Sequence, residues 1–326
     1  MTEKEKFYSQ GIIEINQMVP NPIYRNYKLK KTKQVIFELT VDSGLGGEEV
    51  EIDMLNDVHL NYCNEEDEKD EEVMLTKKCR PYNANGSSVN CVIGSMDVAQ
   101  YADQTVFAGD TLDFLSMGNI EMMKKHIYDR DPNVLIPIGG HEFSKHVLTG
   151  LRDKLPFSER LEILQKHWIH DIHYATKDVK DKVICVGLDN SPGRYVDGLA
   201  EKLQADVERA RKENKIILLF QHEPLSTGVP EDADTPYFYN AYQGNRNYYD
   251  GVLIFSKSKP QTEANMAMYE VLKESTDVIK GVFAGHFHSL FYNEIVFENG
   301  KRIPQYTCVG NSYFGYDGVV TRIFVK

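Results

Sequence analysis

The sequence predicts a layered α/β fold, in which strands and helices alternate along the chain. Short apolar runs that end in glycine, aspartate or histidine are followed by amphipathic stretches with apolar positions at helical spacing. This alternation favours a largely parallel sheet covered by helices. The chain has 326 residues, of which 41 % are hydrophobic, and this is enough for a sizeable core. We expect residues 1–326 to form a single domain, because no linker is long enough to demand two.

The first part of the chain is expected to contain a hairpin and an acidic insertion. Residues 33–42 and 48–55 alternate as strands do, on either side of a glycine-rich turn, so a hairpin over about residues 1–50 should lead into the core. Residues 63–72 carry a run of charges without an apolar face. We interpret this run as a solvated loop or helix start in preference to a partner-binding acidic patch, and the insertion over about residues 61–86 as a surface elaboration.

From residue 87 onward, helices and strands are predicted to alternate. Residues 87–102 form a serine-capped helical pattern, and residues 105–110 form a short strand that ends in Gly-Asp. The further predicted helices are 119–129, 156–172, 197–215 and 262–275, and the further predicted strands are 133–140, 182–189, 216–223 and 278–288. The histidines of HWIHDIH (167–173) lie at a predicted helix end, and we interpret them as exposed or capping residues and not as a metal site.

Charge and cysteine content narrow the possible functions. A net charge of −12 and a pI near 5.4 would repel nucleic-acid backbones, so no such binding is expected, and a phosphate substrate would need a cation. The five scattered cysteines lack CxxC spacing, which favours reduced thiols. The sequence shows no signal-peptide pattern and no run of about 18 apolar residues, so we expect a cytoplasmic protein without a membrane partner. The sequence does not indicate an oligomeric state.

Acidic residues and histidines follow five of the predicted strands. The strand-end sequences are NDVH (56–59), GDTLD (109–113), GGHE (139–142), QHE (221–223) and GHFH (285–288). Ligands of α/β folds bind outside the carboxyl ends of strands, so these side chains should meet. Burying several carboxylates and imidazoles together is costly unless cations compensate them, and this donor set suits Zn, Mn or Fe. We therefore predict a site for two metal ions.

The order of these motifs resembles that of the calcineurin-like metallophosphoesterase superfamily. The family pattern is D-x-H, G-D-x-x-D, G-N-H-[DE], a lone histidine after a strand, and G-H-x-H, and the resemblance covers roughly residues 50–310. It implies a four-layer α/β/β/α sandwich with two divalent metal ions, Mn, Fe or Zn. It also implies an enzyme that hydrolyses phosphoric esters.

The resemblance further implies a role for each motif residue. The implied metal ligands are Asp57, His59 and His288 for the first ion, Asp110 as the bridge, and His222 and His286 for the second ion. His141 would be the general acid that protonates the leaving oxygen, and Asp113 would orient its imidazole and keep it charged. Two such cations can lower the pKa of a bridging water, and the resulting hydroxide would attack the phosphate ester.

The third motif departs from the family pattern. Gly140 stands where the family has an asparagine that ligates the second metal. Glycine tolerates positive φ as asparagine does, so the turn itself should survive. Three outcomes are open: weaker metal binding with activity retained, a sharp loss of activity, or a binding protein without the chemistry. We favour a working phosphoesterase, because losing one group around a metal typically costs about 10–100-fold; the alternative is a catalytically impaired metal-binding or interaction protein.

The expected substrate is a phosphate mono- or diester of a small or nucleotide-like molecule. Phe114, Leu115 and Ile138 stand where the protein Ser/Thr phosphatases of the superfamily carry arginines, so a phosphoprotein is a less favoured substrate. A Tyr-rich loop over about residues 227–260 could cover the metals, or it could form an aromatic cluster of its own. The predicted substrate contacts are Tyr239, Tyr242 and Arg246 from this loop, and Asn311.

Overall fold

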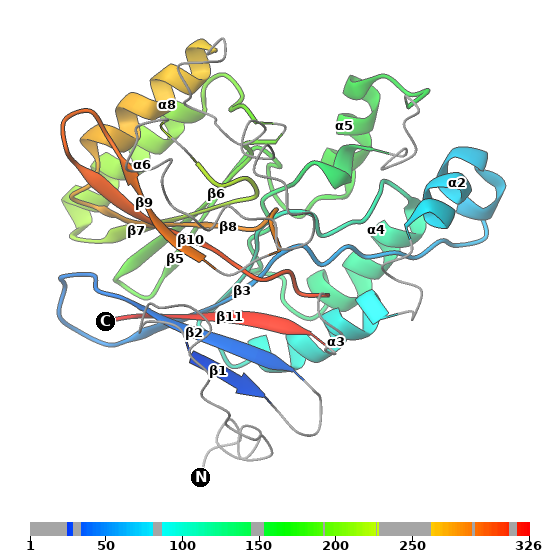
Figure 1. The fold of residues 1–326 in the computed structure, drawn as a ribbon, viewed down its shortest axis with the longest axis horizontal. Helices are drawn as coiled ribbons and strands as arrows, with labels where there is room; N and C mark the ends of the chain where they lie inside the picture. Colours follow the sequence, from blue (N-terminus) through cyan, green and yellow to red (C-terminus); the bar gives the residue numbers. More distant parts are fainter. Residues whose placement is uncertain are drawn as a thin grey trace.

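The protein is built from two stacked β-sheets with helices on both outer sides (Figure 1). The computed structural model describes residues 25–28, 34–80, 87–144, 153–191, 193–225, 227, 262–288, 291–312 and 318–326. Within these residues the arrangement confirms the predicted four-layer sandwich. Nearly all of the Tyr-rich loop, with Tyr239, Tyr242 and Arg246, lies outside the described residues, so those substrate contacts stay predictions.

The first sheet places the last strand of the chain among the first described strands. In chain order its described strands are β1 (Arg25–Lys28), β2 (Val35–Val41), β3 (Val50–Leu55), β4 (Gln104–Phe107) and β11 (Val319–Val325). They lie side by side in the order β1-β2-β11-β3-β4. The predicted hairpin of β2 with β3 is therefore wrong, because β11 lies between them, parallel to β2 and antiparallel to β3. Nearly all of β11 is buried, as a central strand requires, and β2 forms its antiparallel hairpin with β1.

The second sheet is mostly parallel. Across the sheet, its described strands are β5 (Tyr174–Val179), β6 (Val183–Leu188), β7 (Ile216–Gln221), β8 (Ile279–Ala284), β10 (Arg302–Thr307) and β9 (Phe291–Val296). The four inner strands run parallel, and β5 and β9 form antiparallel edges. Every residue of β6 and β7 is buried, which explains their continuous apolar sequences. The polar, half-buried β5 was not predicted, because an edge strand needs no apolar run.

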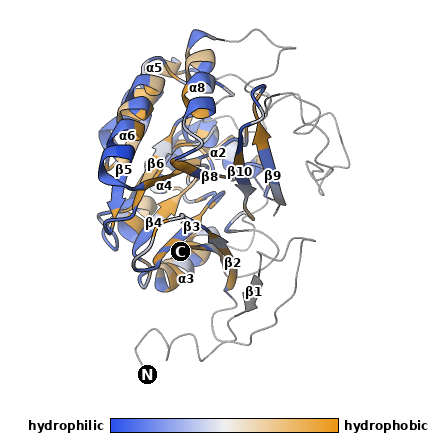
Figure 2. Cartoon of the chain, turned by 90° about the vertical axis from the view of Figure 1, so that its left-hand side faces the viewer, coloured by the Kyte–Doolittle hydropathy of each residue, from blue (hydrophilic) through white to orange (hydrophobic). Residues whose placement is uncertain are grey.

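Helices cover the outer face of each sheet. The first sheet is covered by α3 (Ser87–Ala99), α4 (Met117–Met123) with its π-helical continuation (Lys124–Tyr128), and α5 (Phe157–His167). The second sheet is covered by α6 (Leu199–Glu213) and α8 (Glu263–Glu274). In α6, Leu203, Val207 and Ala210 are buried at three- and four-residue spacing. Figure 2 shows hydrophilic and hydrophobic residues alternating along α6 and α8, and hydrophobic residues on strands such as β4. No described helix is long and apolar enough to cross a membrane.

An apolar core between the two sheets joins them, in addition to the apolar contacts between each sheet and its helices. Side chains from β3 and β4 pack there against side chains from β7 and β8, among them Phe220 and Phe283, whose stacked rings have centroids 5.2 Å apart. Both phenylalanines are fully buried. Because this core holds the sheets face to face, the carboxyl ends of strands from different sheets are fixed relative to each other.

The predicted strand 133–140 is buried but largely irregular. Leu135 makes an isolated parallel bridge to Val106 of β4. Pro137 has no N–H to donate, and Ile136 bonds to side chains instead of a strand. Its N–H donates to Nε2 of His170 (2.9 Å), and its carbonyl accepts from Nε1 of Trp168 (2.8 Å). The apolar run was therefore identified correctly: Leu135 bonds to β4, whereas the hydrogen bonds of Ile136 run to the segment after α5.

The acidic insertion is docked on the protein. It contains a 3-10 turn, η1 (Asp67–Lys69), and the helix α2 (Glu71–Cys79), whose N-terminus is capped by the carboxylate of Asp70. Asp67 is buried, and its carboxylate accepts two hydrogen bonds from backbone N–H groups at the start of α4. The predicted helix start is confirmed. Most of the acidic run is exposed or half-buried, as expected, but Asp67 departs from the expected solvated segment because it is buried and stabilises the N-terminus of α4.

Candidate metal centre

The six predicted metal ligands follow the carboxyl ends of four strands. They are Asp57 and His59 after β3, Asp110 after β4, His222 after β7, and His286 and His288 after β8. β3 and β4 are parallel neighbours in the first sheet, and β7 and β8 are parallel neighbours in the second. One group of ligand atoms, from Asp57, Asp110 and His222, lies within 4.8 Å and spans both sheets. The structure therefore brings these strand ends together at one edge of the sandwich.

A first group of donors joins Asp57, His59 and His288. Nε2 of His288 lies 3.0 Å from Oδ1 of Asp57 and 3.3 Å from Nε2 of His59. Asp57 is fully buried, and it accepts hydrogen bonds from Nδ2 of Asn56 (2.6 Å) and from the N–H of His286 (3.0 Å). The three donor atoms are close enough to one another to bind a single cation.

A second group of donors surrounds Asp110. Its Oδ2 lies 3.1 Å from Nε2 of His222, and Nε2 of His222 lies 3.3 Å from Nδ1 of His286. The other ring nitrogen of His222 is 3.1 Å from the carbonyl oxygen of Ala108. Such a backbone partner fixes the ring and its tautomer, as is usual for metal-binding histidines. Asp110 thus lies where it can contribute to both groups.

The charges of the site fit bound cations. Burial alone would lower the pKa of His222, but the carboxylate of Asp110 raises it to about 10. Burial and the charge of His222 lower the pKa of His286 to about 4. Burial would raise the pKa of Asp57, yet His288 holds it below its usual range. The buried carboxylates therefore require positive charge, and imidazole nitrogens with carboxylate oxygens form a donor set that fits Zn, Mn or Fe.

Most of the ligands adopt a left-handed backbone conformation. The φ angles are 49° at Asp57, 51° at His59, 49° at Asp110, 69° at His286 and 53° at His288. Among the described residues, the other non-glycine residues with positive φ are Lys180 and Asn214. This conformation is unfavourable for residues that carry a Cβ atom, and it concentrates at functional sites. The occurrence of this backbone conformation at five of the six candidate ligands supports a functional role for these residues.

Two glycines let the ligand-bearing segments approach each other. Gly109 has a φ of 81°, and a Cβ atom there would lie 2.6 Å from the side chain of His222. A Cβ atom at Gly139 would overlap the carboxylate of Asp110. The glycines of the second and third motifs are therefore required by close contact with metal-ligand side chains.

Gly140 is not constrained in this way. Its φ of −74° and ψ of −28° lie in the ordinary right-handed region, so the turn does not use the positive φ that glycine and asparagine both tolerate. A Cβ atom would meet no atom of the described residues within 4 Å. The turn would therefore accept an asparagine at this exposed position without rearrangement.

His141 lies beside Asp113, but its closest contact there is with the main chain. Its Nδ1 is 2.8 Å from the carbonyl oxygen of Asp113 and 3.5 Å from the carboxylate Oδ1. That same Oδ1 is closer to Nδ1 of His59, at 3.2 Å. Burial would lower the pKa of His141, but the charges of Asp110 and Asp113 raise it. Nε2 of His141 lies 3.8 Å from Oδ2 of Asp110, so it faces the metal ligands.

Glu142 ties the second motif to the third, a role that was not predicted. It is fully buried, and its carboxylate accepts hydrogen bonds from the N–H groups of Thr111 (2.5 Å) and Gly139 (2.9 Å). Burial and the charge of Asp110 raise its pKa to about 7. The position of Glu142 at the end of the third motif could have indicated a role for this residue in the site. Arg80, a buried arginine of the insertion, was also missed, because no motif spacing marks it.

Asn311 has a structural role. It is fully buried, and its Nδ2 donates to Oγ of Ser95 (2.7 Å) and to the carbonyl of Val319 (2.8 Å). Its backbone N–H donates to the carbonyl of Asn56, next to Asp57. The predicted substrate contact is therefore wrong, because the side chain is inaccessible and its amide donors are used. Asn311 instead supports the segment that carries the first motif.

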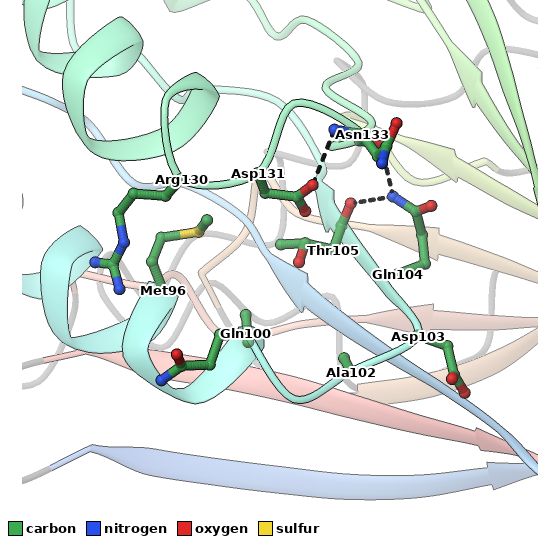
Figure 3. Close-up of a pocket in the computed structure, with 10 residues that line it drawn as sticks. Met96, Gln100, Ala102, Asp103, Gln104, Thr105, Arg130, Asp131 and Asn133 are labelled. Carbon is green, nitrogen blue, oxygen red and sulfur yellow. Dashed lines mark hydrogen bonds between the residues drawn. The ribbon is translucent and has the colours of Figure 1, made fainter.

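A hollow of about 370 Å³ elsewhere on the first sheet does not belong to the site (Figure 3). It lies at the amino end of β4, whereas Asp110 follows the carboxyl end of that strand. Its polar groups are bonded to each other or to nearby side chains: Nε2 of Gln104 donates to the carbonyl of Asn133, and Arg130 pairs with Asp97. Among the described residues that line it, no group of His, Cys, Asp or Glu side chains is close enough together to hold a metal ion.

Comparisons with known proteins give distant structural similarities. No family model and no curated protein matches the sequence. A purple acid phosphatase from yellow lupin (Lupinus luteus) seeds is 10 % identical to this chain, with a TM-score of 0.45. The match covers 92 % of this chain and 48 % of the lupin phosphatase, so this chain spans about half the length of that protein. A dimetal phosphatase from Danio rerio is 13 % identical with a TM-score of 0.40, over 80 % of this chain and 87 % of its own. Because both TM-scores are low, we base the functional assignment on the side chains.

The fold and the site together define the class of protein that this chain resembles. Two stacked sheets lie between helices, and five motifs in the family order meet at one edge. In these features the chain resembles the calcineurin-like metallophosphoesterases. The resemblance holds for the arrangement of donors and for the position of His141 beside them.

Proposed function

We propose that this protein is a phosphoesterase that hydrolyses a phosphate mono- or diester with two divalent metal ions bound. The observation that supports the proposal best is the convergence of Asp57, Asp110 and five histidines from separate strand ends. A buried cluster of this kind is costly without cations, and perturbed titratable groups concentrate at active sites. Mn, Fe or Zn would suit its donors.

The residues of the chain would position the cations and move a proton. When bound, the cations would supply Lewis-acid charge and a nucleophile at neutral pH. The proposed ligands are Asp57, His59 and His288 for one ion, His222 and His286 for the other, and Asp110 for both. His141 would donate the proton on Nε2 to the leaving oxygen, while the carbonyl of Asp113 holds its Nδ1.

The alternative is a metal-binding protein with impaired chemistry. Gly140 favours this alternative, because it offers no side chain where the family has a ligand. The open space around Gly140 favours the enzyme, since a water molecule could replace the missing amide there. The close approach of the other candidate ligands supports the enzyme, which we keep as the proposal.

A small ester is the proposed substrate class. The protein Ser/Thr phosphatases of the superfamily carry arginines at positions that are apolar in this chain. The side chains at these positions, Phe114, Leu115 and Ile138, are buried in the core, which disfavours a phosphoprotein as substrate. A small-molecule or nucleotide-like ester places fewer demands on the surface around the metals. This part of the proposal rests on sequence positions and on burial.

The decisive experiment is ester hydrolysis by metal-stripped protein refilled with Mn²⁺, Fe²⁺ or Zn²⁺. We expect turnover of p-nitrophenyl phosphate or bis-p-nitrophenyl phosphate. The loss in His141→Ala should be smaller with these esters, whose p-nitrophenolate leaves without a proton, than the loss of about 10²–10⁴-fold expected with an alkyl ester. Gly140→Asn should fit the turn and raise metal affinity and turnover by about 10–100-fold. Activity in Gly140→Asn alone would favour the impaired-protein alternative, and no activity with any metal would overturn the proposal.

A further inference from the structure

We propose that Arg80 is a positioning residue that acts through Asp113 on a metal ligand, His59, and on the proposed acid, His141. Arg80 belongs to the acidic insertion and is the C-cap residue of α2. The metal-binding part of this inference rests on the geometry, and the catalytic part rests on the proposed function. Together they assign the insertion a role in the site.

The two ends of the described insertion hold the two oxygens of Asp113. Arg80 is 6 % exposed, and its Nε donates to Oδ1 of Asp113 at 2.8 Å, while Nη2 contacts the same oxygen. Nδ2 of Asn61 donates to Oδ2 at 2.7 Å. A carboxylate bonded on both oxygens in this way cannot rotate without losing charge-assisted hydrogen bonds. Asp113 is fully buried, so water cannot replace those bonds at little cost.

The oxygen that Arg80 holds is the one that faces both histidines. Oδ1 of Asp113 lies 3.2 Å from Nδ1 of His59 and 3.5 Å from Nδ1 of His141. A histidine that binds metal through one ring nitrogen usually donates its other N–H to a carboxylate or carbonyl, and the loss of that partner weakens metal binding about 10–100-fold. Fixing this oxygen therefore orients the ring of His59, and it keeps a negative charge beside the ring of His141, whose Nδ1 is held by the carbonyl of Asp113.

Stability alone is a weak explanation for this ion pair. A buried arginine–carboxylate pair often contributes no more to stability than a well-packed apolar pair would. The chain has such a structural pair elsewhere: Arg322 donates to both oxygens of Asp53, at 2.8 and 2.7 Å, between β11 and β3. Arg322 and Asp53 are as buried as Arg80 and Asp113, but they belong to the sheet and not to the donor groups of the site. They provide a matched control.

The test is a double-mutant cycle on metal affinity and turnover. Mn²⁺ and Zn²⁺ titrations of the metal-stripped full chain by calorimetry would compare Arg80→Met, Asp113→Asn and the double variant with the unchanged protein, and kcat/KM for bis-p-nitrophenyl phosphate would be measured alongside. We expect each single variant to weaken metal binding about 10–100-fold, and the double variant to match Asp113→Asn within about twofold, because Arg80 acts through Asp113. Arg80→Lys should restore part of the affinity, since it keeps the charge without the fork of donors.

The controls separate the possible failures. Arg322→Met should lower the melting temperature but leave metal affinity unchanged, which distinguishes positioning from general destabilisation. Additive losses in the double variant, or a normal metal affinity in Arg80→Met, would overturn the inference. If Arg80→Met does not fold, the same cycle is run with Arg80→Lys. If the unchanged protein binds metal but hydrolyses no ester, the proposed function fails, and the affinity cycle still decides the role of Arg80.

Discussion

Individual residues of the site combine an unfavourable backbone conformation with dense hydrogen bonding. Asp57 and His59 have φ angles of 49° and 51°, and their N–H groups donate to the carbonyls of Gly109 and Asp110. A left-handed conformation costs a residue with a Cβ atom roughly 1–2 kcal/mol. The backbone hydrogen bonds between the first and second motifs offset part of this cost. This conformation lets the side chains of the first and second motifs converge on the same site, which gives a functional reason for its cost.

A single histidine outside the site should make stability depend on pH. Nε2 of His170 accepts a hydrogen bond from Ile136, and burial lowers the pKa of His170 below its usual 6.5. Below pH 6.5 the unfolded chain therefore binds a proton that the folded chain does not, so this residue reduces stability as the pH falls, until its folded-state pKa is reached. Glutamine can accept the same bond without titrating. His170→Gln should lose less stability than the unchanged protein between about pH 7 and about pH 5.

Urea unfolding at several pH values measures this difference. The free energies of unfolding of the two proteins should be closest near neutral pH and diverge toward lower pH. Equal pH dependence in both proteins would contradict the prediction. The sequence suggested that the histidines of this segment are exposed or capping residues, and His170 differs because its partner, Ile136, is distant in the sequence.

At the scale of helices and strands, local patterns predicted the elements but not all of their pairings. The spacing of apolar residues in α6 and the apolar run of β7 are local signals, and both elements form as expected. The position of β11 between β2 and β3 has no local signal. Arg322 of β11 bonds to Asp53 of β3 across 269 positions of sequence. Such pairs are recognised only when the fold is known, so the turn between β2 and β3 suggested a hairpin instead.

The 3-10 turn η1 should contribute to stability through one carboxylate. Asp67 accepts from the N–H groups of Met117 and Gly118, at 2.9 and 2.6 Å, and so stabilises the first turn of α4. Asp67→Ala should lower the free energy of unfolding by about 1.5–3 kcal/mol, because it leaves buried donors without their charged acceptor. Urea denaturation followed by circular dichroism measures the loss. Asp67→Asn should lose less, since it keeps an acceptor oxygen.

A neighbouring acidic residue supplies the control for this experiment. Glu68 is exposed on the same turn, and Glu68→Ala should change stability by no more than about 0.5 kcal/mol. If Asp67→Ala and Glu68→Ala behave alike, the turn does not anchor the insertion. The acidic run would then be the solvated segment that its composition suggests.

At the scale of the whole molecule, the site depends on the stacking of two sheets. The convergence of the six candidate ligands could be predicted because each follows a strand, and the carboxyl ends of parallel strands meet at one edge. The surrounding residues could not be predicted in this way. Asn61 and Arg80 reach Asp113 from an insertion, and the backbone of Gly140 is set by a turn whose conformation no motif specifies. Ligand positions follow from the order of strands, whereas the residues that orient the ligands depend on tertiary packing.

Removal of metal should destabilise the whole domain, because the ligands come from both sheets. A ligand that binds only the folded state stabilises it by about 2.7 kcal/mol at a free concentration of 100 times its Kd. For a chain of this size, each kcal/mol shifts the melting temperature by roughly 1–2 °C, so a chelator should lower it by a few degrees and added Mn²⁺ or Zn²⁺ should restore it. His222→Ala should reduce this response, whereas His126→Ala on the π-helical turn should not. A melting temperature that neither chelator nor metal changes would show that these strand ends hold no structural metal, and the proposed centre would have to be abandoned.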